Sequence, residues 1–152
     1  MKLAEALAQR KDLTTKIAEL EKRAKSVATV QEGQTPVEDP IALAALVQER
    51  TFGLIELVKR INRANVQPLP DEEPPVNLAE LIVERDHLRR LASFYQSFAE
   101  EGKPNSVRYS RLEIAVISTI PVGEYIAKAE AMAERARKID LKIQKLDWQI
   151  DL

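Results

Sequence analysis

Glu84 and His87, in the segment ERDHLRR, are the two side chains best spaced for metal chemistry. Glu and His three positions apart project to one side of a helix, and carboxylate-bridged two-metal bundles use two such motifs plus two further glutamates. The chain has a single His, so a second motif would have to come from a symmetric partner. Arg85 takes the position that faces a neighbouring helix, which leaves Glu84 and His87 beside that seam. The sequence therefore favours a surface or ion-pairing role for them, with no bound metal and no cofactor.

Three arginines, Arg10, Arg50 and Arg85, each occupy a seam position in a different predicted helix. A guanidinium in an apolar seam is costly unless it is paired. Three interpretations stay open. The long stems pack along the seam while the charged heads reach solvent, or the arginines form a polar layer that fixes register and partner number, or they bind an anion. No Gly-rich phosphate loop, Ser-His-Asp set or HExxH motif accompanies them.

The elements that must position these side chains are long amphipathic helices. Apolar residues recur in steps of three and four, as in coiled coils, and clusters of Gly and Pro interrupt them at 33–40, 66–75 and 102–104. The pattern predicts four helices of similar length, over residues 2–28, 40–65, 77–101 and 121–150. Matched lengths favour antiparallel neighbours. We expect a mainly α fold, a coiled-coil-like bundle that forms a single domain over 1–152. The first and last helices could pair along their length, and the middle two could pair likewise.

The segment RYSRLEIAVISTI, residues 108–120, departs from this pattern because it is rich in β-branched residues. Leu112, Ile114 and Val116 would share one face of a strand. The sequence therefore predicts a short β element near 111–119. A lone strand leaves its backbone donors and acceptors unpaired. We expect it to pair with residues 26–31, or to form an assembly strand that a second subunit completes.

Composition limits the possible functions. The chain has 152 residues, a net charge of −1 and no Cys. This balance gives no field that attracts nucleic acid or an anionic membrane, and no apolar run approaches the ~20 residues of a membrane span. The charged start, MKLAEALAQRKDL, lacks the apolar core of a signal peptide. We expect a cytoplasmic protein without nucleic-acid or membrane partners; the sequence does not indicate a small-molecule ligand.

Several segments, in this order, resemble the septicolysin-like family of small bacterial proteins: MKLAEALAQRKDL, VQEGQTPVEDP, LVKRINRAN, VERDHLRRL and RYSRLEI. The resemblance spans nearly the whole chain, and RINRAN and RYSRLEI are its most specific parts. It implies a family without agreed catalytic residues. The family's label also implies a cytolysin, although one alternating strand cannot form a pore.

The sequence favours a structural or interaction protein over an enzyme. In this interpretation the chain forms a homo-oligomer, dimeric or higher, through coiled-coil and strand contacts. The alternative is a metal-dependent all-α enzyme that uses helix carboxylates with Glu84 and His87. A membrane-active protein is a third option, implied only by the family label.

Overall fold

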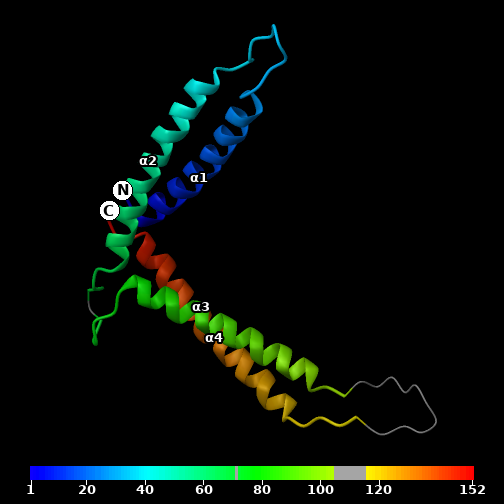
Figure 1. The fold of residues 1–152 in the computed structure, drawn as a ribbon. Coiled ribbons are helices and arrows are strands. Elements are labelled where there is room, and N and C mark those ends of the chain that lie inside the picture. The colour runs from blue at the N-terminus through cyan, green and yellow to red at the C-terminus, as the bar shows by residue number, and fades with distance from the viewer. Residues whose placement is uncertain (71, 105–115) are drawn as a thin grey trace, which may run out of the picture. The chain divides into compact units, whose positions relative to one another are not determined.

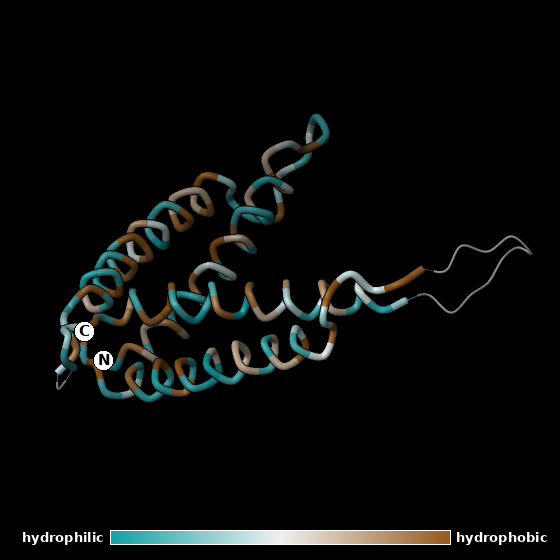
Figure 2. Tube along the Cα trace, turned by 90° about the horizontal axis from the view of Figure 1, so that it is seen from below, coloured by the Kyte–Doolittle hydropathy of each residue, from teal (hydrophilic) through white to brown (hydrophobic). Residues whose placement is uncertain are grey.

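The computed structural model describes residues 1–70, 72–104 and 116–152. Its four helices confirm the predicted mainly α fold: α1 (Leu3–Ser26), α2 (Pro40–Asn65), α3 (Leu78–Glu101) and α4 (Val122–Asp147) (Figure 1). Each helix begins within two residues of its predicted start. Brown and teal segments alternate along the helices in Figure 2, as expected of amphipathic helices.

The helix starts follow from local sequence. Asp39 precedes Pro40 and accepts hydrogen bonds from the backbone N–H of Ile41 and of Ala42, at 2.9 and 3.2 Å. Asn77 accepts from the Glu80 N–H at 3.0 Å, and the Glu80 carboxylate accepts from the Asn77 N–H at 2.9 Å. These bonds satisfy donors that the first turn of a helix leaves free. They explain why α2 and α3 begin where the sequence predicts.

The chain divides into two compact units, one formed by 1–67 with 145–152 and the other by 68–144. In the first, α1 and α2 pack as an antiparallel pair, and in the second α3 packs antiparallel to α4, as Figures 1 and 2 show. Both pairs are antiparallel, as the matched lengths favour, but they join sequence neighbours and not the first helix with the last or the second with the third. A hairpin closes a shorter loop and so loses less conformational entropy. The single domain over 1–152 stays a prediction.

The core of each unit is a single seam between two helices. Both seams are mainly aliphatic and include small residues that let the helices approach closely. In the first unit the buried helix residues are Leu3, Ala6, Ile17, Leu43, Leu57 and Ile61. In the second they are Leu78, Leu81, Leu88, Ala99, Ala129, Ala136 and Ile143.

The end of α4 differs from the prediction, because the helix stops at Asp147 and not at residue 150. The chain then turns to meet the start of α1. The Leu3 N–H donates to the Ile150 carbonyl at 2.9 Å, and the Leu152 N–H donates to the Met1 carbonyl at 3.0 Å. The Lys2 ammonium lies 2.7 Å from the Asp151 carboxylate. Residues 149–152 therefore supply an acceptor to the first turn of α1, which a longer helix could not do.

The predicted β element is not formed where the structure describes it. Residues 116–119 adopt no strand, nor do the expected partners at 26–31; Leu112 and Ile114 lie outside the described residues. The Ser118 hydroxyl contacts the Ile120 backbone, 2.9 Å from its carbonyl oxygen and 3.4 Å from its nitrogen. Such side-chain bonds compete with strand pairing, and here they direct the chain into α4. Val116 is exposed.

We expect Leu78→Ala to lower the free energy of unfolding by about 2–5 kcal/mol, as for other buried leucines, because it leaves a cavity. Leu78 is 1% exposed, and Leu141 of the same unit, which is 66% exposed, is the matched control. Urea denaturation followed by circular dichroism measures both variants. Equal losses in Leu78→Ala and Leu141→Ala would contradict the assignment of the core.

Stability should also fall in acid. The hydrogen bond from Lys2 lowers the pKa of the Asp151 carboxyl below its ordinary value of 3.8. The ion pair therefore stabilises the fold above that value, and its contribution is lost as the pH falls through the lowered pKa. We expect the urea midpoint to decrease less between pH 6 and pH 3 in Asp151→Asn than in the unmodified chain. Identical pH dependence would show that this pair adds nothing to stability.

Candidate functional site

A charged cluster lies in the seam between α3 and α4. Arg85 of α3 places Nη1 3.1 Å from Asp140 Oδ1 of α4 and Nη2 2.8 Å from Asp86 Oδ1. Arg89 reaches the same Asp140 oxygen at 3.1 Å, and the Gln144 amide donates to the other Asp140 oxygen at 3.0 Å. Asp140 is thus shared by donors from both helices. We call these five residues the Asp140 cluster.

The cluster suits a structural role better than catalysis. The Arg85 side chain is 19% exposed, and every polar group named above has a partner. Hydrogen bonding to Asp86 raises the pKa of Arg85, while the same bond lowers the pKa of Asp86 below its ordinary range. Both groups are therefore held in their charged forms. A permanently charged, saturated pair can fix the register of two helices but has no spare proton to transfer.

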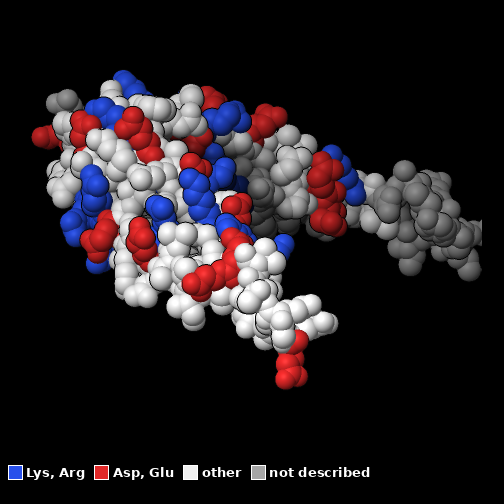
Figure 3. Space-filling view, turned by 90° about the horizontal axis from the view of Figure 1, so that it is seen from above, with Lys and Arg blue, Asp and Glu red and all other residues white. Residues whose placement is uncertain are grey.

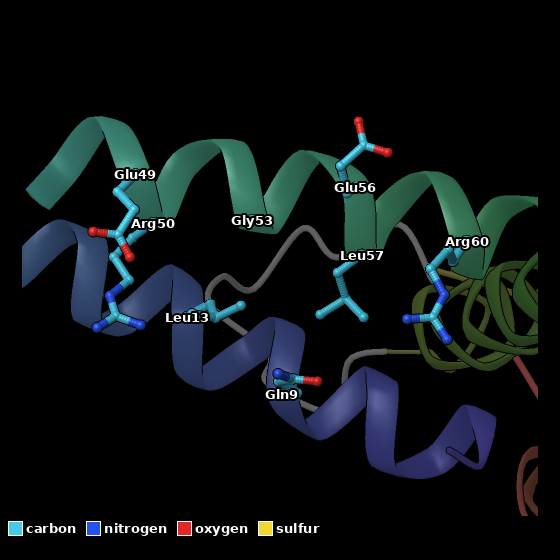
Figure 4. Close-up of a pocket in the computed structure, with 8 residues that line it drawn as sticks. All are labelled: Gln9, Leu13, Glu49, Arg50, Gly53, Glu56, Leu57 and Arg60. Atoms are coloured by element: carbon cyan, nitrogen blue, oxygen red, sulfur yellow. The ribbon is translucent and has the colours of Figure 1, made fainter.

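The other two seam arginines have different surroundings. Arg10 is exposed on α1, and Arg50 of α2 lines a groove that α1 and α2 form together (Figure 4). Of the three predicted residues, only Arg85 lies in an ion-paired layer with a facing helix. The structure does not bring the three together at one place. Their joint role in setting partner number stays a prediction.

The groove has a volume of about 310 Å³. In Figure 4, Arg50 and Arg60 stand at opposite ends, with Leu13 and Leu57 between them and Gly53 leaving the wall without a side chain. The Arg60 guanidinium donates to the Leu152 carbonyl at 3.3 Å. The groove therefore offers both guanidinium and carboxylate groups around a small apolar centre, since Glu49 and Glu56 also line it. The sequence analysis did not predict this groove. The signal in the sequence is Gly53, in the middle of an apolar helix.

Glu84 and His87 do not converge on a metal position. The Glu84 carboxylate forms an ion pair with Arg135 of α4. His87 is exposed, and its Nδ1 lies 2.9 Å from the Val83 carbonyl, the geometry of a donated hydrogen bond. Throughout residues 1–70, 72–104 and 116–152, no three His, Asp or Glu side chains come close enough to hold a metal ion. Glu84 and His87 are therefore both engaged by other groups of the protein, a side chain of α4 and a backbone carbonyl of α3.

Aromatic side chains close the seam at the far end of α3. The rings of Phe98 and Tyr125 meet edge to face with centroids 4.9 Å apart, and Tyr95 lies 5.7 Å from Tyr125. The Lys128 ammonium sits 4.6 Å from the Tyr125 ring centroid. Edge-to-face rings and a cation over a ring are stabilising arrangements. This cluster packs α3 against α4.

On the face seen in Figure 3, charge does not single out a binding region, because blue and red side chains are interspersed there with no extended region of one sign. Within the described ranges, none of the helices qualifies as a bilayer-spanning segment.

The Asp140 cluster generates a prediction about helix register. We expect Asp140→Ala to lower the free energy of unfolding by about 1–2 kcal/mol, because charged hydrogen bonds are lost at a partly exposed site. The double variant Arg85→Met with Asp140→Leu should regain part of that loss, since the two charges that then lack a partner, Asp86 and Arg89, are more than half exposed and stay solvated. Urea denaturation measures each variant. The control, Glu134→Gln, breaks an exposed pair with Lys138 within α4. If Asp140→Ala costs no more than this control, the cluster does not fix the register.

Comparison with known proteins finds one matching family and a similar solved structure. The model of a family of unknown function, DUF6847, matches residues 10–152. The crystal structure of a functionally unknown conserved protein from Corynebacterium diphtheriae is similar, with 37% sequence identity and a TM-score of 0.88. The match covers 100% of this chain and 98% of that one. No curated protein matches.

These findings overturn the resemblance to the septicolysin-like family, since neither match has a link to it. The segments that carried it are mainly heptad and capping sequences, whose composition many amphipathic helices share. The cytolysin implied by that label falls with it. The match of a family model to nearly the whole sequence shows that this chain belongs to the DUF6847 family.

Proposed function

We propose that the protein is a structural or interaction module that assembles with copies of itself through helix contacts. One observation carries the proposal: α2 has apolar side chains on two opposite faces, and α1 covers only one of them. The covered face includes Leu43, Leu57 and Ile61, which are all buried. On the other face, Ile41, Phe52 and Ile55 are exposed.

The helical repeat explains why these sets point in opposite directions. A helix has 3.6 residues per turn, so Phe52 and Ile55 lie about three and four turns beyond Ile41 on the same side. Small and uncharged residues fill the space between them. We call this exposed face the outer stripe of α2, formed by Ile41, Ala44, Ala45, Gln48, Phe52 and Ile55. Every residue of the stripe is exposed in the single chain.

The energetics are consistent with reversible association. Burying one Ile or Phe side chain contributes roughly 1.5–3 kcal/mol. Ile41, Phe52 and Ile55 from two copies would thus contribute roughly 9–18 kcal/mol as an upper bound, because Phe52 and Ile55 are partly covered already. Association loses about 4–15 kcal/mol of translational and rotational freedom. The gain from burial and the loss of freedom are of similar size. This supports a reversible pairing that depends on protein concentration.

The assembly strand is the second part of the proposal. Leu112 and Ile114 lie outside the described residues, and Val116 and its neighbour Ile117 are exposed in a segment without regular secondary structure. An extended apolar segment can pair with another chain through its backbone. In this proposal it adds to the helix contacts.

We expect light scattering coupled to gel filtration to give at least twice the chain mass of 17.2 kDa at micromolar concentration and above. The reason is the exposed apolar face described above, which single chains rarely keep uncovered. A mass of one chain at every protein concentration between about 1 and 500 µM would refute self-assembly.

The variant Ile114→Lys with Val116→Lys separates the two contacts. If the strand contributes, this variant lowers the fraction of assembled protein while the helix content, measured by circular dichroism, stays the same. An unchanged assembly would confine the contacts to the helices. The control is Thr119→Lys with Ala127→Lys, which adds the same charge to exposed positions of the same unit.

A further inference from the structure

We infer that two copies of the chain pair through the outer stripe of α2 in an antiparallel orientation, with the two Gln48 side chains facing each other at the axis. The inference rests on the proposed self-assembly and names its surface, orientation and register. The observations that carry it are the sizes, polarity and charges of residues along α2.

The outer stripe is complementary in size to its own reversed copy. Ile41 and Ile55 are equally spaced on either side of Gln48. In an antiparallel pair, Ile41 of each copy therefore lies opposite Ile55 of the other. Ala44 and Phe52 are also equally spaced about Gln48, so each large ring meets a small side chain of the other copy. Small opposite large is how facing helices interlock. The same order of residues would place Phe52 against Phe52 in a parallel pair.

Gln48 is the polar residue at the centre of the otherwise apolar stripe. A side-chain amide carries both donors and an acceptor. Two Gln48 amides that meet across a twofold axis can therefore satisfy each other. A polar residue in a helix seam fixes register, because any shift leaves it opposite an apolar side chain. The neighbouring Glu49 does not interfere, since it lines the groove on the α1 side (Figure 4).

Charges at the two ends of the stripe favour the same orientation. Lys59, which pairs with Glu56, and Arg63 follow the stripe toward the end of α2. Glu38, which pairs with Arg23, and the capping Asp39 lie just before its start. An antiparallel pair brings the basic end of one copy beside the acidic start of the other. A parallel pair would align like charges. Complementary charges of this kind select orientation more than they add affinity.

Disulfide formation tests the orientation, because the chain has no Cys of its own. A disulfide requires Cα atoms within ~7 Å, so Gln48→Cys at the axis should form a covalent dimer under mild oxidation. The control is Asn62→Cys, on the same side of α2. Asn62 lies about 21 Å along the helix from Gln48, so two copies of it would be ~40 Å apart in the antiparallel pair. We expect a disulfide-linked dimer on non-reducing gels for Gln48→Cys and none for Asn62→Cys.

A matched pair of charge variants tests the surface itself. Phe52 is 59% exposed and Phe94 of α3 is 54% exposed. We expect Phe52→Glu to weaken association at least about 30-fold, as for a buried aromatic at an interface centre, and Phe94→Glu to leave it unchanged. Analytical ultracentrifugation measures both dissociation constants.

The outcomes separate this inference from the proposed function. Disulfide dimers from both cysteine variants would overturn the antiparallel orientation in favour of a parallel pair. An assembled protein in which Gln48→Cys does not cross-link, or Phe52→Glu has no effect, would overturn the outer stripe as the contact while self-assembly stands. A single-chain mass for the unmodified protein at every concentration would overturn both.

Discussion

The packing of each helix against its neighbour in sequence is the constraint on which the rest of the structure depends. A helix with one such neighbour buries one stripe of side chains, and the described core consists of two such stripes together with Leu69 of the connection between α2 and α3. Polar side-chain atoms must then find their hydrogen-bond and ion-pair partners at the edges of a narrow seam. This explains why Arg85 with Asp140 and Arg135 with Glu84 form ion pairs between facing helices at the rim. It also explains why no buried side-chain nitrogen or oxygen lacks a partner in the part of the chain that the structure describes.

The Asp140 cluster shows how such a seam can be specified. Aliphatic side chains are interchangeable, so a seam of leucines and alanines allows sliding by a heptad with little loss. Asp140 removes that freedom in the second unit, because Arg85 and Arg89 of α3 and Gln144 of α4 all converge on it. The first unit uses a different solution. There the pairing of Lys2 with Asp151 and of Arg23 with Glu38 fixes the ends of the helices.

The sequence predicted the elements better than their arrangement. Pro40, Asn77 and Gly102 act on the residues next to them, so the bounds of the helices could be inferred locally. Which helix pairs with which could not, because heptad seams look alike and each would accept any other. The partners of Arg85 and Glu84 lie on α4, far away in sequence, so only the folded chain shows that these side chains are already engaged. The groove beside Gly53 was missed for the same reason, since it needs both helices to exist.

Residues 149–152 give the first unit an unusual dependence on the order of synthesis. The N–H of Leu3 and the ammonium of Lys2 are synthesised before residues 68–144, whereas their acceptors in Ile150 and Asp151 are synthesised after them. The hairpin of 68–144 can therefore close while the start of α1 still lacks its acceptor. Translation thus imposes a sequence of events in which the unit begun first is completed last.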